Sequence, residues 1–476
     1  MSPHLLEFIT VGFGLILLMV EAFSNGHRSR IGLIAAAGLT VILSMLFCPT
    51  PEGYEVPTWM SRFYGYDSLA RFYKIIALVS TILVLLMAID FRKVLSQYTS
   101  GDDSESGTGE FYCLPIFACA GLMWMASATD LVSIFVALEL VTITFYVMVA
   151  YMRRNVGSLE AGVKYLILGA LSTGFLVYGI AWLYGTLGST HLEAITAAVH
   201  KGDFNPTFLL FGVSLILIAL GFKVGAAPMQ LWIPDVYQGA PTPITAYLSV
   251  ASKAAGFVVL MHIIGPFLDA EATRGPVVFI LLIMAGATLV YGNLAAISQS
   301  NFKRLLAYSS IAHAGFLLIG VATSDFTSVS FYLATYLLMT FASFFVLALV
   351  RSHEGSDEID AFDGLGKRNP AVAFALTICM SALAGIPLTA GFWGKFFIFK
   401  SAITHNVSWW LIAIAFVSVA AGFYYYLKVV KAMYWNAPRR ENAIVVPVTT
   451  QAVLIVLTIA ILVLGIYPQP ILDLLK

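Results

Sequence analysis

The chain is built from apolar stretches that are each long enough to cross a lipid bilayer as a helix. Of its 476 residues, 59% are hydrophobic and 11% are charged, whereas soluble globular proteins carry about 25% charged residues. A bilayer core about 30 Å thick needs about 20 apolar helical residues. We therefore expect an all-α polytopic membrane protein with about 14 transmembrane helices, near residues 5–23, 31–48, 71–90, 111–128, 130–152, 159–187, 206–227, 243–265, 276–298, 303–323, 327–350, 370–402, 408–435 and 446–468.

The basic residues near the ends of these stretches and between them are distributed unevenly across the membrane. Regions after odd-numbered stretches hold Arg28, Arg30, Arg92, Lys93, Arg153, Arg154, Lys303, Arg304, Arg351, Lys367, Arg368, Lys428, Lys431, Arg439 and Arg440. Regions on the other side hold Arg62, Arg71, Lys74, Lys201 and Arg274. Because cytoplasmic loops carry an excess of Lys and Arg, both termini should lie on the non-cytoplasmic side, and we expect a bacterial inner membrane. The first stretch contains Glu7 and no basic n-region, so we expect a transmembrane helix there and not a cleaved signal.

Two of the stretches are interrupted by proline and glycine. The seventh runs into AAPMQLWIPDVYQGAPTP, where Asp235 is expected to cap or brace the broken helix, and the twelfth contains AGIPLTAGFWG. Non-helical backbone at membrane depth survives only inside protein or along a cavity. Paired breaks at corresponding positions indicate inverted repeats around an ion path. Since these breaks lie five stretches apart, we predict two inverted five-helix repeats, each with a broken helix.

This pattern divides the chain into four regions. Residues 1–110 would hold three transmembrane helices and a polar cytoplasmic loop, and residues 111–265 the first repeat, from the fourth to the eighth helix. Residues 276–435 would form the second, inverted repeat, from the ninth to the thirteenth helix, and residues 446–476 would add a final helix. No separate soluble domain is expected.

Charged residues lie deep inside several of the apolar stretches. They are the acid Glu139 and the lysines Lys164, Lys223, Lys253 and Lys395. A charge at mid-bilayer costs about 2.5–3.5 kcal/mol on insertion scales, and intramembrane charges mark proton and ion pathways. Movement of protons or ions is therefore the first functional hypothesis.

Glu139 and Lys223 form the natural ion pair, because each lies near the middle of its stretch and both belong to the first repeat. A pair that is made and broken could gate protonation of a neighbouring lysine; the alternative is a static salt bridge that fixes helix packing. Lys253 suits a titrating relay site, against the alternative of snorkelling to an interface. Lys395 follows the second break and would face its cavity, unless its role is in packing.

Two further residues extend this set. Lys164 lies about five residues into its stretch and is expected to modulate the Glu139–Lys223 pair. His313 lies between Lys253 and Lys395 in chain order, and an ordinary histidine pKa of about 6.5 suits proton shuttling. The alternative for His313 is a hydrogen-bonded core histidine. Three tyrosines at 424–426 could extend the route or could simply pack.

The sequence offers no metal or cofactor site of its own. The four cysteines form no CxxC pair, and no His or Cys cluster has the spacing of metal ligands. A Gly-rich phosphate loop of the Rossmann or P-loop kind is also missing from the sequence. The formal net charge is +0 without a basic tail, which argues against nucleic acid as a partner.

Three blocks of sequence resemble a known family. LWIPDVYQGAPTPITAYLSVASKAAGF, NFKRLLAYSSIAHAGF and GIPLTAGFWGKF are similar to the antiporter-like subunits of respiratory complex I, the proton-translocating NADH:quinone oxidoreductase. They resemble subunits of multi-component sodium/proton antiporters less closely. Leu138 precedes Glu139 where the M and L types usually have Trp, and Lys395 stands where the M type has glutamate. The chain also stops after fourteen stretches, without the long lateral helix of the L type. The resemblance is therefore strongest to the N-type subunit, subunit 2 in mitochondrial naming.

The resemblance implies a role for each deep charge. Glu139 and Lys223 would be the gating pair, Lys253 the central relay lysine, Lys395 the lysine nearest the exit, and Lys164 an accessory lysine. It also implies K-type and M-type membrane subunits as neighbours, with FMN and iron–sulfur clusters in partner subunits that use NADH and quinone. The alternative is a subunit of a multi-component cation/proton antiporter without redox coupling.

Overall fold

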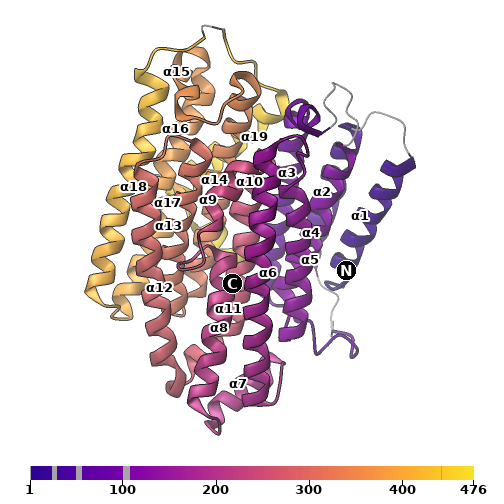
Figure 1. Ribbon diagram of the computed structural model, residues 1–476, viewed down its shortest axis with the longest axis vertical. Coiled ribbons are helices and arrows are strands. Elements are labelled where there is room, and N and C mark those ends of the chain that lie inside the picture. The colour runs from indigo at the N-terminus through magenta and orange to yellow at the C-terminus, as the bar shows by residue number, and fades with distance from the viewer. Residues whose placement is uncertain (1, 24–28, 50–55, 100–107, 441, 476) are drawn as a thin grey trace.

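The computed structural model describes residues 2–23, 29–49, 56–99, 108–440 and 442–475 as an all-helical bundle (Figure 1). Its N-terminal part holds α1 (Leu5–Phe23), α2 (Ser29–Met45) and α3 (Ser68–Thr99). The next part holds α4 (Gly109–Ser127), α5 (Leu131–Val149), α6 (Val156–Leu187), α7 (Leu192–Lys201), α8 (Pro206–Val224), α9 (Trp232–Gly239), α10 (Thr242–Tyr247), the π-helical turn Leu248–Ser252 and α11 (Lys253–Asp269).

The C-terminal half continues the same architecture. It holds α12 (Glu271–Ile297), α13 (Phe302–Ala322), α14 (Phe326–Glu354), a 3₁₀ turn at Ile359–Phe362, α15 (Leu365–Arg368), α16 (Pro370–Ala384), α17 (Ala390–Thr404), α18 (Trp409–Trp435), α19 (Val448–Ile466) and α20 (Gln469–Leu474). Among the described residues, 12 helical units are long and apolar enough to cross a membrane, and two further apolar helices are shorter. These units follow the predicted stretches in order, so the all-α membrane fold is confirmed. The four-region division remains a prediction.

The two predicted breaks are present, and the helices that lead into them share start and stop signals. Asn205 and Asn369 cap α8 and α16 through their side-chain oxygens, each followed by proline at the first helical position. This is the position where a proline's fixed φ and missing N–H cost least. Both helices end at a glycine in the left-handed region, Gly225 with φ 81° and Gly385 with φ 92°. The residue after each glycine donates its N–H back across the last turn, as in a Schellman cap.

The two broken helices run in opposite directions. In Figure 1, α8 leads away from the end of the molecule where α7 lies, whereas α16 descends from the opposite end, beside α15. The loops also fit helices that alternate in direction. Backbone bridges join Tyr64 to Ala128 and Asp130 to His191, so the loops before α3, between α4 and α5, and after α6 meet at one end of the bundle. Opposed half-helices are what an inverted repeat requires.

Helix α13 is the most enclosed membrane helix, with its whole membrane window buried. It packs against α9, α12, α14, α17 and α18. Its close contact with α12 depends on glycine, because a Cβ added at Gly292 would lie 2.6 Å from the backbone nitrogen of Ala312. Small residues of this kind let membrane helices approach closely. Side chains of α13 therefore lie between the two halves of the bundle.

Substitution of Gly225 by alanine tests the first break. We expect Gly225→Ala to destabilise the protein by about 1–2 kcal/mol, because an L-residue is strained in the left-handed region, and further because its Cβ would lie 2.4 Å from Cδ1 of Ile233. Gly188→Ala is the matched control, since φ is 75° there and no atom lies within 4 Å. Thermal unfolding in detergent should show a larger loss for Gly225→Ala. Equal losses would contradict the close packing of the break.

Candidate functional site

Lys223 lies in the last turn of α8, buried against α5. Its Nζ atom donates a hydrogen bond to Oγ1 of Thr142 on α5. Glu139 lies three residues before Thr142 on α5, and its Oε1 accepts a hydrogen bond of 2.8 Å from Thr173 on α6. In the described part of the chain no ion pair joins Glu139 to Lys223, so the predicted pair is open in this structure. Its gating role remains a prediction.

Lys164 lies at a surface cavity rather than beside that pair. Its side chain is 42% exposed and forms ion pairs of 2.7 Å with Asp235 and 2.8 Å with Glu160. Asp235 also bonds Arg304 on α13 at 2.9 Å. Because α9 is thereby tied to both α6 and α13, Asp235 braces the broken helix as its position predicted. The depth expected for Lys164 was wrong, because its ammonium faces this polar cavity.

The polar cavity has a volume of about 500 Å³ and is lined by Asn155, Gly157, Glu160, Ala161, Lys164, Asp235, Gln238, Gly239, Asn301, Gly355, Ser356 and Asp357. Behind it lies Lys303, which is buried and donates to the Ala240 carbonyl at 2.9 Å, with Asp357 at 3.6 Å. Sequence reasoning counted Lys303 as a loop cation. The capping asparagine at 301 marks Lys303 as the second residue of α13, a signal that could have placed it inside the protein.

Lys253 is fully enclosed in the centre of the bundle, 2% exposed. It follows directly after the π-helical turn Leu248–Ser252, and such turns occur frequently at functional sites. Its Nζ donates to both the backbone carbonyl and the hydroxyl of Ser310 on α13. The ring of Tyr336 lies 5.7 Å away. The central lysine of the first half is thus bound to a helix of the second half.

His313 lies one turn further along α13 and is hydrogen-bonded through both ring nitrogens. Nδ1 lies 2.7 Å from the Tyr332 hydroxyl, and Nε2 lies 3.0 Å from the Tyr426 hydroxyl. The Tyr426 hydroxyl also bonds Ser309. A neutral imidazole donates from one nitrogen and accepts at the other, so this chain of hydroxyls can reverse its polarity when the tautomer changes. The three tyrosines at 424–426 differ, because Tyr424 is 61% exposed.

Lys395 is buried on α17, just after the second break. Its Nζ donates to the carbonyls of Leu383 and Ala384, at 2.8 Å each, in the last turn of α16. Leu383 stands two residues before its capping glycine, the place that Lys223 occupies in α8. The two lysines therefore approach their breaks from opposite sides of the gap, and they do not occupy equivalent helix positions.

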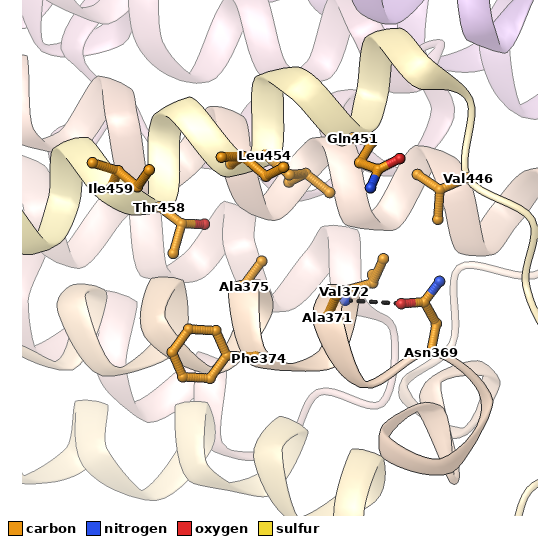
Figure 2. A pocket seen from close by; sticks show the side chains of 11 residues that line it. Asn369, Ala371, Val372, Phe374, Ala375, Val446, Gln451, Leu454, Thr458 and Ile459 are labelled. Carbon is orange, nitrogen blue, oxygen red and sulfur yellow. Dashed lines mark hydrogen bonds between the residues drawn. The ribbon is translucent and has the colours of Figure 1, made fainter.

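One groove lies apart from these charges. A groove of about 450 Å³ separates α16 from α19, with Asn369 and Gln451 toward one end and Phe374, Thr458 and Ile459 toward the other (Figure 2). Its lining residues include no ionisable side chain, so it takes no part in the charged set. Across the described residues, no group of three or more His, Cys, Asp or Glu side chains could hold a metal ion.

The chain matches the family model described as NADH:quinone oxidoreductase/Mrp antiporter, TM, over residues 128–423. Subunit N of the NADH-quinone oxidoreductase of Heliobacterium modesticaldum is 38% identical over 98% of this chain and 96% of the relative. The corresponding subunit of Trichlorobacter lovleyi is 39% identical over 91% of this chain and 88% of the relative. The chain belongs to the NADH-quinone oxidoreductase subunit N family. The resemblance found in the three sequence blocks is confirmed.

The fold agrees with this membership. A chain of respiratory complex I from Thermus thermophilus superposes with a TM-score of 0.82 at 30% identity, covering 98% of both chains. As a subunit N protein, this chain is an antiporter-like membrane subunit of complex I. The family model alone would also admit an antiporter subunit, but the relatives over nearly the full length of the chain are oxidoreductase subunits.

Substitution of Tyr426 by phenylalanine tests the hydroxyl chain at His313. We expect Tyr426→Phe to lower proton translocation by the assembled complex, because it removes the group that bonds both Ser309 and His313. Tyr424→Phe is the matched control on the same helix, since Tyr424 lies at the surface. Acidification of inverted membrane vesicles, followed with a pH-sensitive dye, gives the comparison. Equal translocation by the two variants would exclude the hydroxyl chain from the route.

Proposed function

We propose that this chain translocates protons across a bacterial inner membrane as quinone is reduced elsewhere in its complex. The residues that carry protons are Glu139, Lys223, Lys253, His313 and Lys395, with Lys164 in an accessory role. The observation that best supports the proposal is the bond between Lys253 and Ser310, one turn of α13 from the His313 hydroxyl chain. A buried charge of the first half is thereby held one helical turn from titratable groups of the second half.

The first half acts as a switch in this proposal. Lys223 is hydrogen-bonded to Thr142 and Glu139 to Thr173, so the two charges are not paired with each other. When the pair closes, the charge of Lys223 moves toward Glu139 and is neutralised. Because a nearby like charge disfavours the charged form of a lysine, closure favours protonation of Lys253, and opening favours its release. Perturbation of Glu139 from outside the chain would drive this change.

The second half receives the proton. From Lys253 it passes through the Ser309–Ser310 region of α13 to His313, which takes a proton at one ring nitrogen and gives one from the other. Both Lys253 and Lys395 lie within electrostatic range of His313. Lys395, held by the carbonyls of the broken helix, is the last acceptor in the half. Its ammonium also lines an apolar surface pocket of about 520 Å³ formed by α17 and α18.

The polar cavity around Lys164 is the proposed mouth for proton uptake from the cytoplasm. It lies at the end of the bundle where most basic residues gather, which supports an orientation with both termini on the non-cytoplasmic side. Lys303 and Asp357 beneath it connect to the Ala240 carbonyl. We also propose 111–265 and 276–435 as the two repeats, supported by the shared capping signals of α8 and α16.

Neighbouring membrane subunits of the K and M types are proposed to contact this chain in the membrane, one of them at the face of α5 that carries Glu139. Glu139 is half-buried on α5, and its helical neighbours Val136 and Ile143 are 60% and 57% exposed. A carboxylate facing lipid is expensive, so this face fits a protein partner. The FMN and iron–sulfur clusters belong to partner subunits in this proposal, since this chain passes protons and no electrons.

Neutralising the central lysine tests the function. We expect Lys253→Met to assemble, because methionine fills the same volume, and to abolish or strongly reduce proton translocation. Lys367→Met, at an exposed lysine, should leave translocation unchanged. Vesicle acidification is measured together with NADH oxidation, so that loss of pumping is separated from loss of assembly. Wild-type pumping by Lys253→Met would contradict the proposal.

Purification tests the redox coupling. When the chain is extracted from its native membrane in mild detergent, we expect flavin and iron–sulfur subunits to co-migrate with it. Mass spectrometry of the purified complex identifies them. Migration with cation antiporter subunits and without a flavoprotein would favour the alternative, an antiporter subunit without redox coupling.

A further inference from the structure

A second buried ion pair lies outside the set of residues assigned above. Lys74 on α3 was counted from sequence among the basic residues of the non-cytoplasmic side, but its side chain is fully buried. Its Nζ lies 2.7 Å from Oε1 of Glu7 on α1, a side chain that is 2% exposed. The same Nζ donates to the Tyr64 hydroxyl at 2.6 Å. The pair lies within the first two turns of both helices, and so near one end of the bundle.

Other ionisable groups surround the pair and lead outward. Asp67 lies directly before the first residue of α3, about two turns from Lys74, and is exposed at the surface. His262 of α11, with no hydrogen-bond partner for Nδ1 among the described residues, is within electrostatic range of Asp67. The ring of Tyr66 lies 4.9 Å from the Lys74 ammonium, and the ring of His4 contacts that of Tyr64. The remaining neighbours are Arg71 on α3 and Cys119 of α4.

The inward side of the pair leads toward the central lysine. Thr81 lies two turns after Lys74 on α3, about 10.5 Å along the helix, and its hydroxyl bonds the Tyr247 hydroxyl at 2.6 Å. Tyr247 ends α10 directly before the π-helical turn that leads to Lys253. Polar side chains therefore recur along α3 from the surface at Asp67 to Thr81 in the core, with a gap of two helical turns between Lys74 and Thr81.

Packing alone gives a weak reason for this pair. Taking two charges out of water costs several kcal/mol per ion, and well-packed apolar residues stabilise such a site as well or better. Helix α1 is otherwise poorly buried, because only 33% of the residues in its apolar membrane-spanning segment are enclosed by the rest of the protein. An ion pair with one exposed acid above it and hydroxyls below it is better suited to passing a proton than to holding two helices together.

We propose that Glu7 and Lys74 form a proton-release site that opens to the non-cytoplasmic side through Asp67. The proposal rests on the proton-translocating function given above. A proton that branches from Lys253 by way of Thr81 and intervening water, as an exit separate from Lys395, binds the Glu7 carboxylate, which becomes a neutral acid, and Lys74 shifts toward Asp67. The neutral Glu7 then gives its proton to water at the surface, and the carboxylate and ammonium pair again. No other bond forms or breaks.

Paired substitutions separate this role from packing. Glu7→Gln and Lys74→Met each leave one buried charge without a partner, so each single variant should assemble poorly. The double variant removes both charges and should assemble at the wild-type level. If the pair only packs, the double variant also pumps normally. If the pair releases protons, it oxidises NADH but shows the same fall in protons translocated per NADH as Lys253→Met.

The measurement uses membrane vesicles that contain the whole complex, with acidification and NADH oxidation recorded together. The matched control is Glu193→Gln with Lys201→Met, an exposed acid and lysine of α7, which should leave the ratio unchanged. A wild-type ratio in the Glu7→Gln, Lys74→Met variant, with a lowered ratio in Lys253→Met, would overturn the release site alone. A wild-type ratio in Lys253→Met would overturn the proposed function itself.

A second measurement needs no variant. A carbodiimide that reacts with protonated carboxyl groups in apolar surroundings should label Glu7 of the native complex faster during NADH oxidation than at rest. Peptide mass spectrometry locates the label. Equal labelling of Glu7 in both conditions, or none, would contradict protonation of this residue during turnover.

Discussion

An ammonium ion inside an apolar helix bundle needs oxygen atoms around it, and this requirement shapes the whole protein. A continuous α-helix offers few along its length, because most of its carbonyls are bonded within the helix. The chain supplies them where helices stop. Lys395 uses the free carbonyls at the end of α16, and Lys303 uses Ala240 at the end of α9. Lys223 uses the hydroxyl of Thr142 on α5, and Lys253 uses both the hydroxyl and the backbone carbonyl of Ser310 within α13. Broken helices and buried lysines are thus two parts of one arrangement.

The same arrangement explains the central place of α13. A helix buried on all sides can present polar groups in several directions at once, and α13 presents Ser310 to Lys253 in one half and His313 to Tyr332 and Tyr426 in the other. Close packing at Gly292 holds it against α12. A fixed hydrogen-bonded frame of this kind costs little reorganisation when a proton moves. In the proposed mechanism the mobile element is the contact between Glu139 and Lys223, which form no ion pair among the described residues.

Much of this could be predicted from sequence, for definite physical reasons. Membrane thickness fixes the length of an apolar stretch, and proline and glycine fix the breaks, so the order of helices and the two gaps were predictable. Contacts between helices were less so. Whether Lys223 contacts Glu139 or Thr142 depends on small helix rotations. For the same reason Lys164, expected to be deep, is partly exposed, and Lys74, not expected to be deep, is buried. The asparagine–proline starts and glycine stops shared by α8 and α16 were present in the sequence and would have strengthened the repeat assignment.

The account depends most on one claim, that the buried lysines change protonation as the complex turns over. Infrared difference spectroscopy of the purified complex, recorded on addition of NADH with and without isotopically labelled lysine, tests it most directly. The account predicts lysine bands that shift with the label and that are lost in part when Lys253 is methionine. A difference spectrum without any label-sensitive lysine band, in a complex that still pumps protons, would contradict it.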